Sequence, residues 1–212
     1  PWRNNSLHPL DGSGLSMSLT GSEKILGSDV RFLTADINSF NVFPAIGLHR
    51  IYTHLRFQAQ WGDPLPQNYI GFSKYDNIDL NLPGEVPFVL FNEAERVRGY
   101  REFVAGKQVA FGSLEYRMPF LPSLQTEVLG LVSLGSTALA LFTDAGAVWD
   151  ARRADGTTGT ETRWGAGAEI KNRISVFGVG FTHALGIAQP AQELFTDADY
   201  DLYYRVRAVV PF

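Results

Sequence analysis

Apolar residues recur at every second position through most of the chain, in segments of about ten residues. Between Ile51 and Trp61, for example, Leu55 and Phe57 belong to the apolar set, and the positions in between hold Tyr, His, Arg and Gln. A period of two indicates β-strands, because successive side chains of a strand point to opposite faces. Strands are expected near residues 14–20, 30–42, 49–61, 108–120, 137–149, 162–172, 174–184 and 202–212. The expected fold class is therefore all-β and antiparallel.

The segments between these strands alternate in length. A short connection follows residue 42, a tight turn is expected at Asn172 and Arg173, and residues 121–136 are long enough for a turn of helix. At the opposite end the connections are long and polar, and the longest covers residues 62–107. Short turns at one end and long loops at the other are typical of a bacterial outer-membrane β-barrel, whose long loops are extracellular.

The two faces of the strands differ in a way that favours a membrane. The polar face carries Arg, Lys, Glu and His on strand after strand, which are too many charges to bury in a small packed core. This disfavours a soluble, lipocalin-like barrel and predicts a watery lumen on the polar side. The apolar face is then expected to contact outer-membrane lipid.

Composition excludes several other classes of protein. The net charge is −4 and the basic residues are scattered, so nucleic acid is not an expected partner. There is no cysteine, and no run of about 18 apolar residues that would form a membrane-spanning helix. No nucleophile–base or metal-ligand motif is found, so we expect no catalytic residues, no metal site and no cofactor, and we expect the protein not to be an enzyme. The spacing of Asp197, Asp199 and Asp201 resembles a calcium loop but lacks its glycine and distal glutamate, which favours a solvated loop.

The chain ends in LYYRVRAVVPF, where Tyr204, Val206, Ala208, Val210 and Phe212 share one face of the expected last strand. An ordinary last strand is one interpretation. An alternating strand that stops at a terminal aromatic residue also resembles the targeting signal that the outer-membrane assembly machinery recognises as an unpaired strand. The absence of a starting methionine at Pro1 suggests a piece of something longer.

Three motifs occur in a fixed order in the second half of the chain: VRGY at 97–100, FGSLEYRMPF at 111–120 and LFTDAGAVWD at 141–150. With the terminal VVPF, they resemble the C-terminal half of the barrel of the BamA/TamA outer-membrane protein assembly superfamily, which includes bacterial surface antigens and two-partner secretion transporters. The resemblance is firm over residues 96–212 and loose before them. It implies that residues 1–212 are a C-terminal outer-membrane barrel region, about eight strands of a barrel that has about sixteen in that family.

The resemblance also implies a role for the loop motif Val97, Arg98, Gly99 and Tyr100. In the family the long loop folds back into the lumen, and its arginine contacts acidic residues of the inner wall, which here correspond to Glu115 and Asp144. Strand parity agrees, because Glu115 lies with Ser113 and Arg117 on the polar face, and Asp144 alternates with Leu141 and Thr143.

Arg98 would then act as a latch, with a planar guanidinium that binds carboxylates through two hydrogen bonds. Gly99 would let the loop approach the wall, and Gly146 would leave room beside Asp144. The alternative is a solvated loop arginine followed by an ordinary turn glycine.

The function implied by the resemblance is insertion or export of a client polypeptide through a lateral seam or through the lumen. In the family the first and last strands meet at a weak seam, where a client strand can pair with the exposed edge. The alternative is a closed eight-stranded outer-membrane barrel with a structural, anchoring or narrow-channel role.

Overall fold

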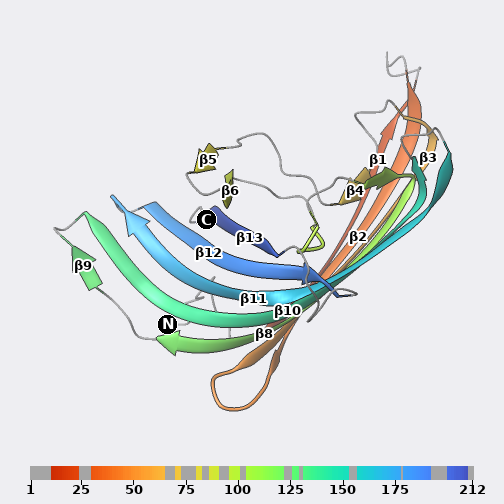
Figure 1. The fold of residues 1–212 in the computed structure, drawn as a ribbon. Coiled ribbons are helices and arrows are strands. Elements are labelled where there is room, and N and C mark those ends of the chain that lie inside the picture. The colour runs from red at the N-terminus through yellow and green to blue at the C-terminus, as the bar shows by residue number, and fades with distance from the viewer. Residues whose placement is uncertain are drawn as a thin grey trace.

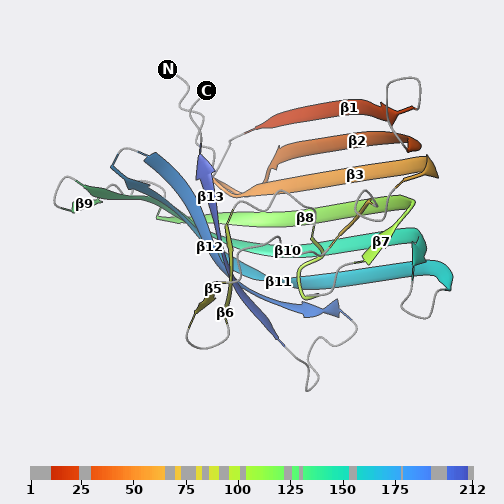
Figure 2. The same cartoon turned by 90° about the horizontal axis from the view of Figure 1, so that it is seen from above.

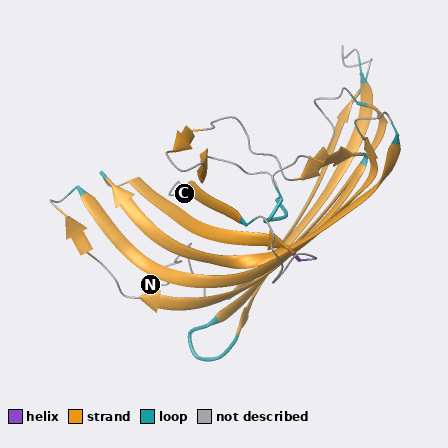
Figure 3. Ribbon diagram, viewed as in Figure 1, coloured by secondary structure: helices purple, strands orange, loops and turns teal. Residues whose placement is uncertain are grey.

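The structure is a computed structural model. It describes residues 11–23, 30–64, 70–72, 80–82, 86–90, 96–100, 104–121, 126–128, 131–152, 157–177, 179–191 and 200–209. In this part of the chain, strands make up nearly all of the regular structure (Figure 3). None of its helical residues form a segment long and apolar enough to cross a membrane.

Eight long strands form one curved antiparallel sheet in which each strand pairs with its neighbours along the chain (Figure 1). They are β1 (Gly12–Ser22), β2 (Arg31–Pro44), β3 (Arg50–Asp63), β8 (Gln108–Leu121), β10 (Val132–Arg152), β11 (Thr158–Val176), β12 (Val179–Pro190) and β13 (Asp201–Val209). All eight strands expected from the alternation of apolar and polar residues are present, and the all-β antiparallel class is confirmed.

One local expectation was wrong. The chain does not turn at Asn172 and Arg173, because β11 continues to Val176 and the reversal comes at Phe177, whose φ is 50°. In the connection between β8 and β10, where a turn of helix was expected, a short strand, β9 (Thr126–Val128), pairs with β10, and residues 122–125, 129 and 130 lie outside the described residues. Both features extend the ladder at the end of the sheet where the connections are short.

Four short strands lie within the connection between β3 and β8. Strands β4 (Ile70–Phe72) and β7 (Val104–Gly106) pair with each other, and β5 (Leu80–Leu82) pairs with β6 (Val86–Leu90). The connection folds back over the concave side of the sheet (Figure 1). Its position inside a barrel lumen stays a prediction, because the described strands do not close into a barrel.

The sheet is open among the described residues. Strand β1 pairs only with β2, and the far edge of β13 pairs in parallel with β6 rather than with β1 (Figure 2). The described strands do not form the closed eight-stranded barrel considered as the alternative.

Large apolar side chains are exposed on the face of the sheet that points away from the loop. Leu55 of β3 is 57% exposed, and Leu114 of β8 and Leu141 of β10 are each 48% exposed. The residues next to them in the chain, such as Glu115 and Phe142, are buried on the concave side. The polar face thus points inward and the apolar face outward, the reverse of a soluble barrel.

The larger of two apolar clusters among the described residues lies between the folded-back connection and the concave face. Its buried members are Phe72, Val97, Val109, Phe111, Val148 and Ala151. Val97 contributes from the VRGY motif and is fully buried. Burial of this kind holds the motif against β8 and β10 without any contribution from charge.

Candidate functional site

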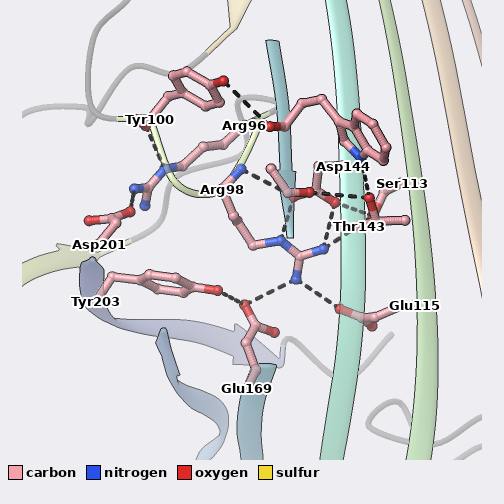
Figure 4. A network of polar contacts seen from close by, with 12 residues as sticks. Arg96, Arg98, Tyr100, Ser113, Glu115, Thr143, Asp144, Glu169, Asp201 and Tyr203 are labelled. Carbon is pink, nitrogen blue, oxygen red and sulfur yellow. Dashed lines mark hydrogen bonds and ion pairs between the residues drawn. The ribbon is translucent and has the colours of Figure 1, made fainter. Parts of the chain in front are cut away.

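Residues 96–100, called here the loop tip, lie against the concave faces of β8, β10 and β11 (Figure 4). A tight turn is closed by the Tyr100 amide, which donates to the Val97 carbonyl at 3.3 Å. Gly99 within it has φ +98°, and a Cβ atom there would lie 2.7 Å from the main-chain carbon of Gln189. Both the backbone conformation and the close approach therefore require glycine at this position.

The Arg98 guanidinium binds the Asp144 carboxylate of β10 through two parallel hydrogen bonds. Nε donates to Oδ2 at 2.6 Å and Nη2 donates to Oδ1 at 2.7 Å. The Arg98 main-chain amide also donates to Oδ2 at 3.1 Å. Asp144 is fully buried, and a further bond from the Ser113 hydroxyl, 2.6 Å from Oδ1, completes its partners.

Two further carboxylates reach the same guanidinium. Nη1 of Arg98 lies 3.0 Å from Oε1 of Glu115 and 3.1 Å from Oε1 of Glu169. The guanidinium carbon also stands over the Phe142 ring, 3.4 Å from its centroid. One loop side chain is thus held by acids of three neighbouring strands and by an aromatic face.

Strand register explains why these acids meet. Ser113, Asp144 and Gly165 lie side by side on β8, β10 and β11, all on the concave face. Glu115 is two residues along β8 from Ser113, and Glu169 is four residues along β11 from Gly165, so both share this face. The three carboxylates therefore surround one point on the wall.

A second layer of cations holds the two glutamates from the other side. Lys171 lies 2.6 Å from Glu115 and 3.1 Å from Glu169. Arg117 donates to Glu115 at 2.5 Å, and Arg205 of β13 contacts Glu169 at 2.7 Å. With Arg98, four cations share three carboxylates, so no acid of the site is left uncompensated.

Arg98 keeps its charge despite its burial. Burial alone would lower the pKa of the guanidinium, but the attraction of Glu169, Asp144 and Glu115 outweighs it and raises the pKa well above its usual value. Arg98 itself therefore stays charged throughout the physiological pH range.

Glycines of the wall make room for the loop tip. A Cβ atom on Gly146 would lie 2.8 Å from the Phe72 ring and 2.9 Å from Val97. One on Gly165 would lie 1.8 Å from the main-chain oxygen of Arg98. We call the concave surface formed by Ser113, Glu115, Asp144, Gly146, Gly165 and Glu169 the loop seat.

Two flanking residues of the loop tip also make contacts. Arg96 forms an ion pair with Asp201 of β13 and lies over the Tyr203 ring, 5.1 Å from its centroid. The Tyr100 hydroxyl donates to the Trp164 carbonyl at 3.4 Å. The loop tip therefore spans the concave face from β8 to β13.

The structure brings together the residues that the family resemblance singled out. Val97, Arg98, Gly99 and Tyr100 lie at the loop seat, and Glu115, Asp144 and Gly146 belong to it. This arrangement differs from the alternative of a solvated arginine, since Arg98 is only 6% exposed.

Sequence reasoning missed Glu169, Lys171 and the pair Arg96–Asp201. The alternation of side chains along the strand placed Glu169 and Lys171 on the polar face. This alternation was the signal in the sequence that could have pointed to them. Asp201 was expected in a solvated loop, but it is buried at the start of β13; Asp197 and Asp199 lie outside the described residues. Of the expected targeting residues, Tyr204 and Val206 lie on β13, whereas Val210 and Phe212 are outside the described residues.

The described sheet is open, its concave face is polar, and a loop arginine is buried against that face. These features agree with the family to which the sequence matches. The chain belongs to the Omp85 superfamily: residues 2–193 match the model of the Omp85 superfamily domain. No curated protein and no solved structure matches the chain significantly.

Proposed function

We propose that the chain forms the wall of an outer-membrane β-barrel of the protein assembly or translocation type. Membership of the Omp85 superfamily supports this proposal, as do the apolar outer face and the polar concave face. Outer-membrane lipid would cover the outer face, and a client polypeptide, the protein to be inserted or exported, would use the lumen or a lateral seam. The proposal involves no catalytic step and no cofactor.

The observation that carries the proposal is the buried contact of Arg98 with three acids on three strands. A structural loop could be held by apolar packing alone, and Val97 already supplies such packing. Burial of an arginine among acids costs desolvation free energy, and its removal leaves the acids without their cation. The loop tip therefore has two distinct positions, seated on the wall and released from it. We infer that the seated loop fills the lumen at rest and that its release clears a path for a client.

The lateral seam would bind a client because an unpaired strand edge is unfavourable in lipid. An unpaired edge exposes amide and carbonyl groups that hydrocarbon cannot satisfy, so an open edge attracts any strand able to pair with it. A client strand that pairs there is inserted by main-chain hydrogen bonds, with side-chain alternation choosing which face meets lipid. The outer-membrane assembly machinery would deliver the protein itself to the membrane by the same recognition.

The test is a comparison of two arginine variants of the full-length protein in its own host. Arg98→Ala removes the contact with the loop seat. Arg56→Ala is the matched control, because it removes another arginine of the concave face, which pairs with Asp36 of β2 at 2.5 Å. Both should reach the membrane, and only Arg98→Ala should lower the amount of folded outer-membrane or secreted proteins in quantitative proteomics. Unchanged protein content in a strain that lacks the protein altogether would contradict the proposed function and favour an anchoring role.

A further inference from the structure

A row of polar side chains crosses the outer face of three neighbouring strands. Thr137 of β10, Asn172 of β11 and His183 of β12 are register partners. They share this face with the exposed residues Ile170 and Leu185, each of which lies two positions along its strand toward the long connections. Polar and ionisable side chains are unfavourable on a face that meets lipid, so such residues usually mark a functional site.

The Asn172 side chain is fixed by β10, at the point where the β10–β11 register shifts. Its Nδ2 atom donates to the main-chain carbonyls of Gly135 and Ser136, at 3.0 Å and 3.4 Å. The same atom donates to the Thr137 hydroxyl at 2.6 Å. Because a carbonyl oxygen only accepts, the amide nitrogen must face β10, and Oδ1 of Asn172 must face His183.

The orientation of Asn172 determines which nitrogen of His183 carries the proton. Nε2 of His183 lies 3.2 Å from Oδ1 of Asn172, and because this oxygen only accepts, Nε2 must donate. The neutral imidazole then has its lone pair on Nδ1. Among the described residues, Nδ1 has no hydrogen-bond partner. His183 therefore offers a hydrogen-bond acceptor on the outer face of the sheet.

An aromatic ring lies beside this acceptor. Tyr204 of β13 pairs with Leu185 and shares its outer face, and the ring centroids of Tyr204 and His183 are 5.7 Å apart, with their planes at 55°. The face of a tyrosine ring attracts a cation within about 6 Å. An acceptor nitrogen beside an aromatic ring suits a ligand that is both a cation and a hydrogen-bond donor. A primary ammonium group has both properties.

The polar row lies near one boundary of the apolar band. Trp164 is exposed near the end of β11 where the connections are long, and tryptophan favours the membrane–water interface. Asn172 is eight residues further along β11, which corresponds to about 27 Å along the strand and, at a tilt of about 40°, to about 20 Å across the membrane. The apolar band of an outer-membrane barrel is about 25 Å tall. The row therefore lies close to the lipid headgroups at the end of the short connections.

We propose that Asn172, His183 and Tyr204 form a binding site for the primary ammonium group of a phospholipid headgroup. Nδ1 of His183 accepts a hydrogen bond from the ammonium, and the Tyr204 ring faces its charge. The inference rests on the proposed function, because it requires that the outer face meets a membrane. The site is continuous with the apolar outer face, so the acyl chains of the same lipid would cover Ile170 and Leu185. This continuity favours a lipid over a soluble amine.

An anionic headgroup fits the site less well. Phosphate oxygens accept hydrogen bonds, and the lone pair on Nδ1 of His183 would repel them. The neighbouring cations Lys171, Arg173 and Arg205 alternate with the residues of the site and therefore lie on the concave face. A quaternary ammonium keeps the charge but has no N–H to donate, so it should bind more weakly than a primary ammonium.

The test measures the lipid that the purified full-length protein retains, by native mass spectrometry. The folded protein is stripped of lipid in detergent and offered equal amounts of phosphatidylethanolamine, phosphatidylcholine and phosphatidylglycerol with identical acyl chains. We expect phosphatidylethanolamine to be retained about tenfold more than phosphatidylglycerol, with phosphatidylcholine in between. Soluble glycerophosphoethanolamine, which has the same headgroup without acyl chains, should not compete at equal concentration.

Substitutions separate the two parts of the site. His183→Phe keeps an aromatic ring but removes the acceptor, and should lower phosphatidylethanolamine retention about fivefold or more. Tyr204→Leu should also lower retention, whereas Tyr204→Phe should not, because it keeps the ring. His54→Phe is the matched control, since His54 also contacts an asparagine oxygen, Oδ1 of Asn38 at 2.8 Å, but on the concave face. This control should retain lipid as the unchanged protein does.

Three results would overturn the inference: equal retention of the three lipids, a preference for phosphatidylglycerol, or retention that neither His183→Phe nor Tyr204→Leu lowers. Folding of each variant is checked by its heat-modifiable migration in gel electrophoresis. If His183→Phe does not fold, Tyr204→Leu decides the question, because it leaves the hydrogen bonds of Asn172 in place.

The lipid site and the proposed function fail in different ways. Lipid retention is read from the purified protein and does not depend on a cellular role. Normal envelope protein content in cells that lack the protein would remove the proposed function and leave the lipid site intact. Loss of the preference for phosphatidylethanolamine would remove the lipid site alone.

Discussion

The main-chain oxygen of Arg98 lies so close to Gly165 that a Cβ atom on Gly165 would be 1.8 Å from it. Backbone atoms cannot swing aside as the end of a side chain can. Gly165→Ala should therefore lift the loop tip although every charge of the loop seat remains. We expect a loss of about 1 to 3 kcal/mol in the free energy of unfolding and faster proteolysis within residues 62–107.

Gly112→Ala is the control for this prediction. A Cβ atom on Gly112 would lie 3.3 Å from Cδ2 of Leu55, a flexible side-chain end. This variant should keep the loop as protected as in the unchanged protein. Equal proteolysis of the two variants would mean that the contact with Gly165 does not hold the loop.

Removing the Arg98 side chain should loosen the loop without unfolding the sheet. Loss of one partner of a fully desolvated pair costs about 3 to 5 kcal/mol, and the cost of Arg98→Ala should fall below that range because Lys171 and Arg205 still compensate the glutamates. Arg98→Lys should restore only part of it, because lysine keeps the charge but lacks the planar fork that grips Asp144.

A double-mutant cycle of Arg98→Ala with Asp144→Asn measures this contact directly. The readouts are protease access to residues 62–107 and the denaturant midpoint in lipid vesicles. We expect the double variant to be much less damaged than the sum of the single variants. Strict additivity would mean that the two residues do not interact energetically.

The loop should also resist salt. The Arg98 contacts are buried, whereas the pair Arg31–Glu23 has side chains that are 77% and 44% exposed. Raising the salt from about 0.1 M to about 1 M shortens the Debye length from about 10 Å to about 3 Å and screens exposed pairs most. Proteolysis of the loop should therefore be nearly unchanged over this range; a steep rise would indicate that water and ions reach the loop seat freely.

The sequence predicted the strands well because alternation is a local property. The apolar and polar sets between Ile51 and Trp61 lie on opposite faces of β3 largely as expected, although Ala59 of the apolar set is buried. The ends of strands were less accurate, as at Asn172, because the β11 ladder continues wherever β12 supplies a partner.

The loop seat could be predicted only in part. The motifs that carry Arg98, Glu115 and Asp144 pointed to these contacts through the family resemblance. Glu169 could not be assigned, because its distance from Arg98 depends on the register of β10 and β11, and that ladder contains two register shifts. Asp201 was missed because its partner, Arg96, is distant in sequence and the buried start of β13 has no local signal.

Substitutions on the two faces of the sheet test the membrane assignment. Leu114→Arg places a charge on the outer face, where Leu114 is exposed, and should cost about 2 to 4 kcal/mol in lipid vesicles if it lies near the bilayer midplane. Gln58→Arg adds the same charge on the concave face, beside Asp36, and should be much milder. The measurement is denaturant unfolding of both variants in vesicles, and similar losses would mean that the assignment of the two faces is wrong.

The ion pair between Arg96 and Asp201 has a consequence for the order of folding. It joins residues 105 positions apart, so the chain must complete β13 and dock it beside β12 before the loop tip has all of its partners. Contacts this distant in sequence form late, since the entropy of closing a long loop is lost before they contribute. We therefore expect the loop tip to gain protection after the strands have paired, so that protection of the loop marks the completion of folding.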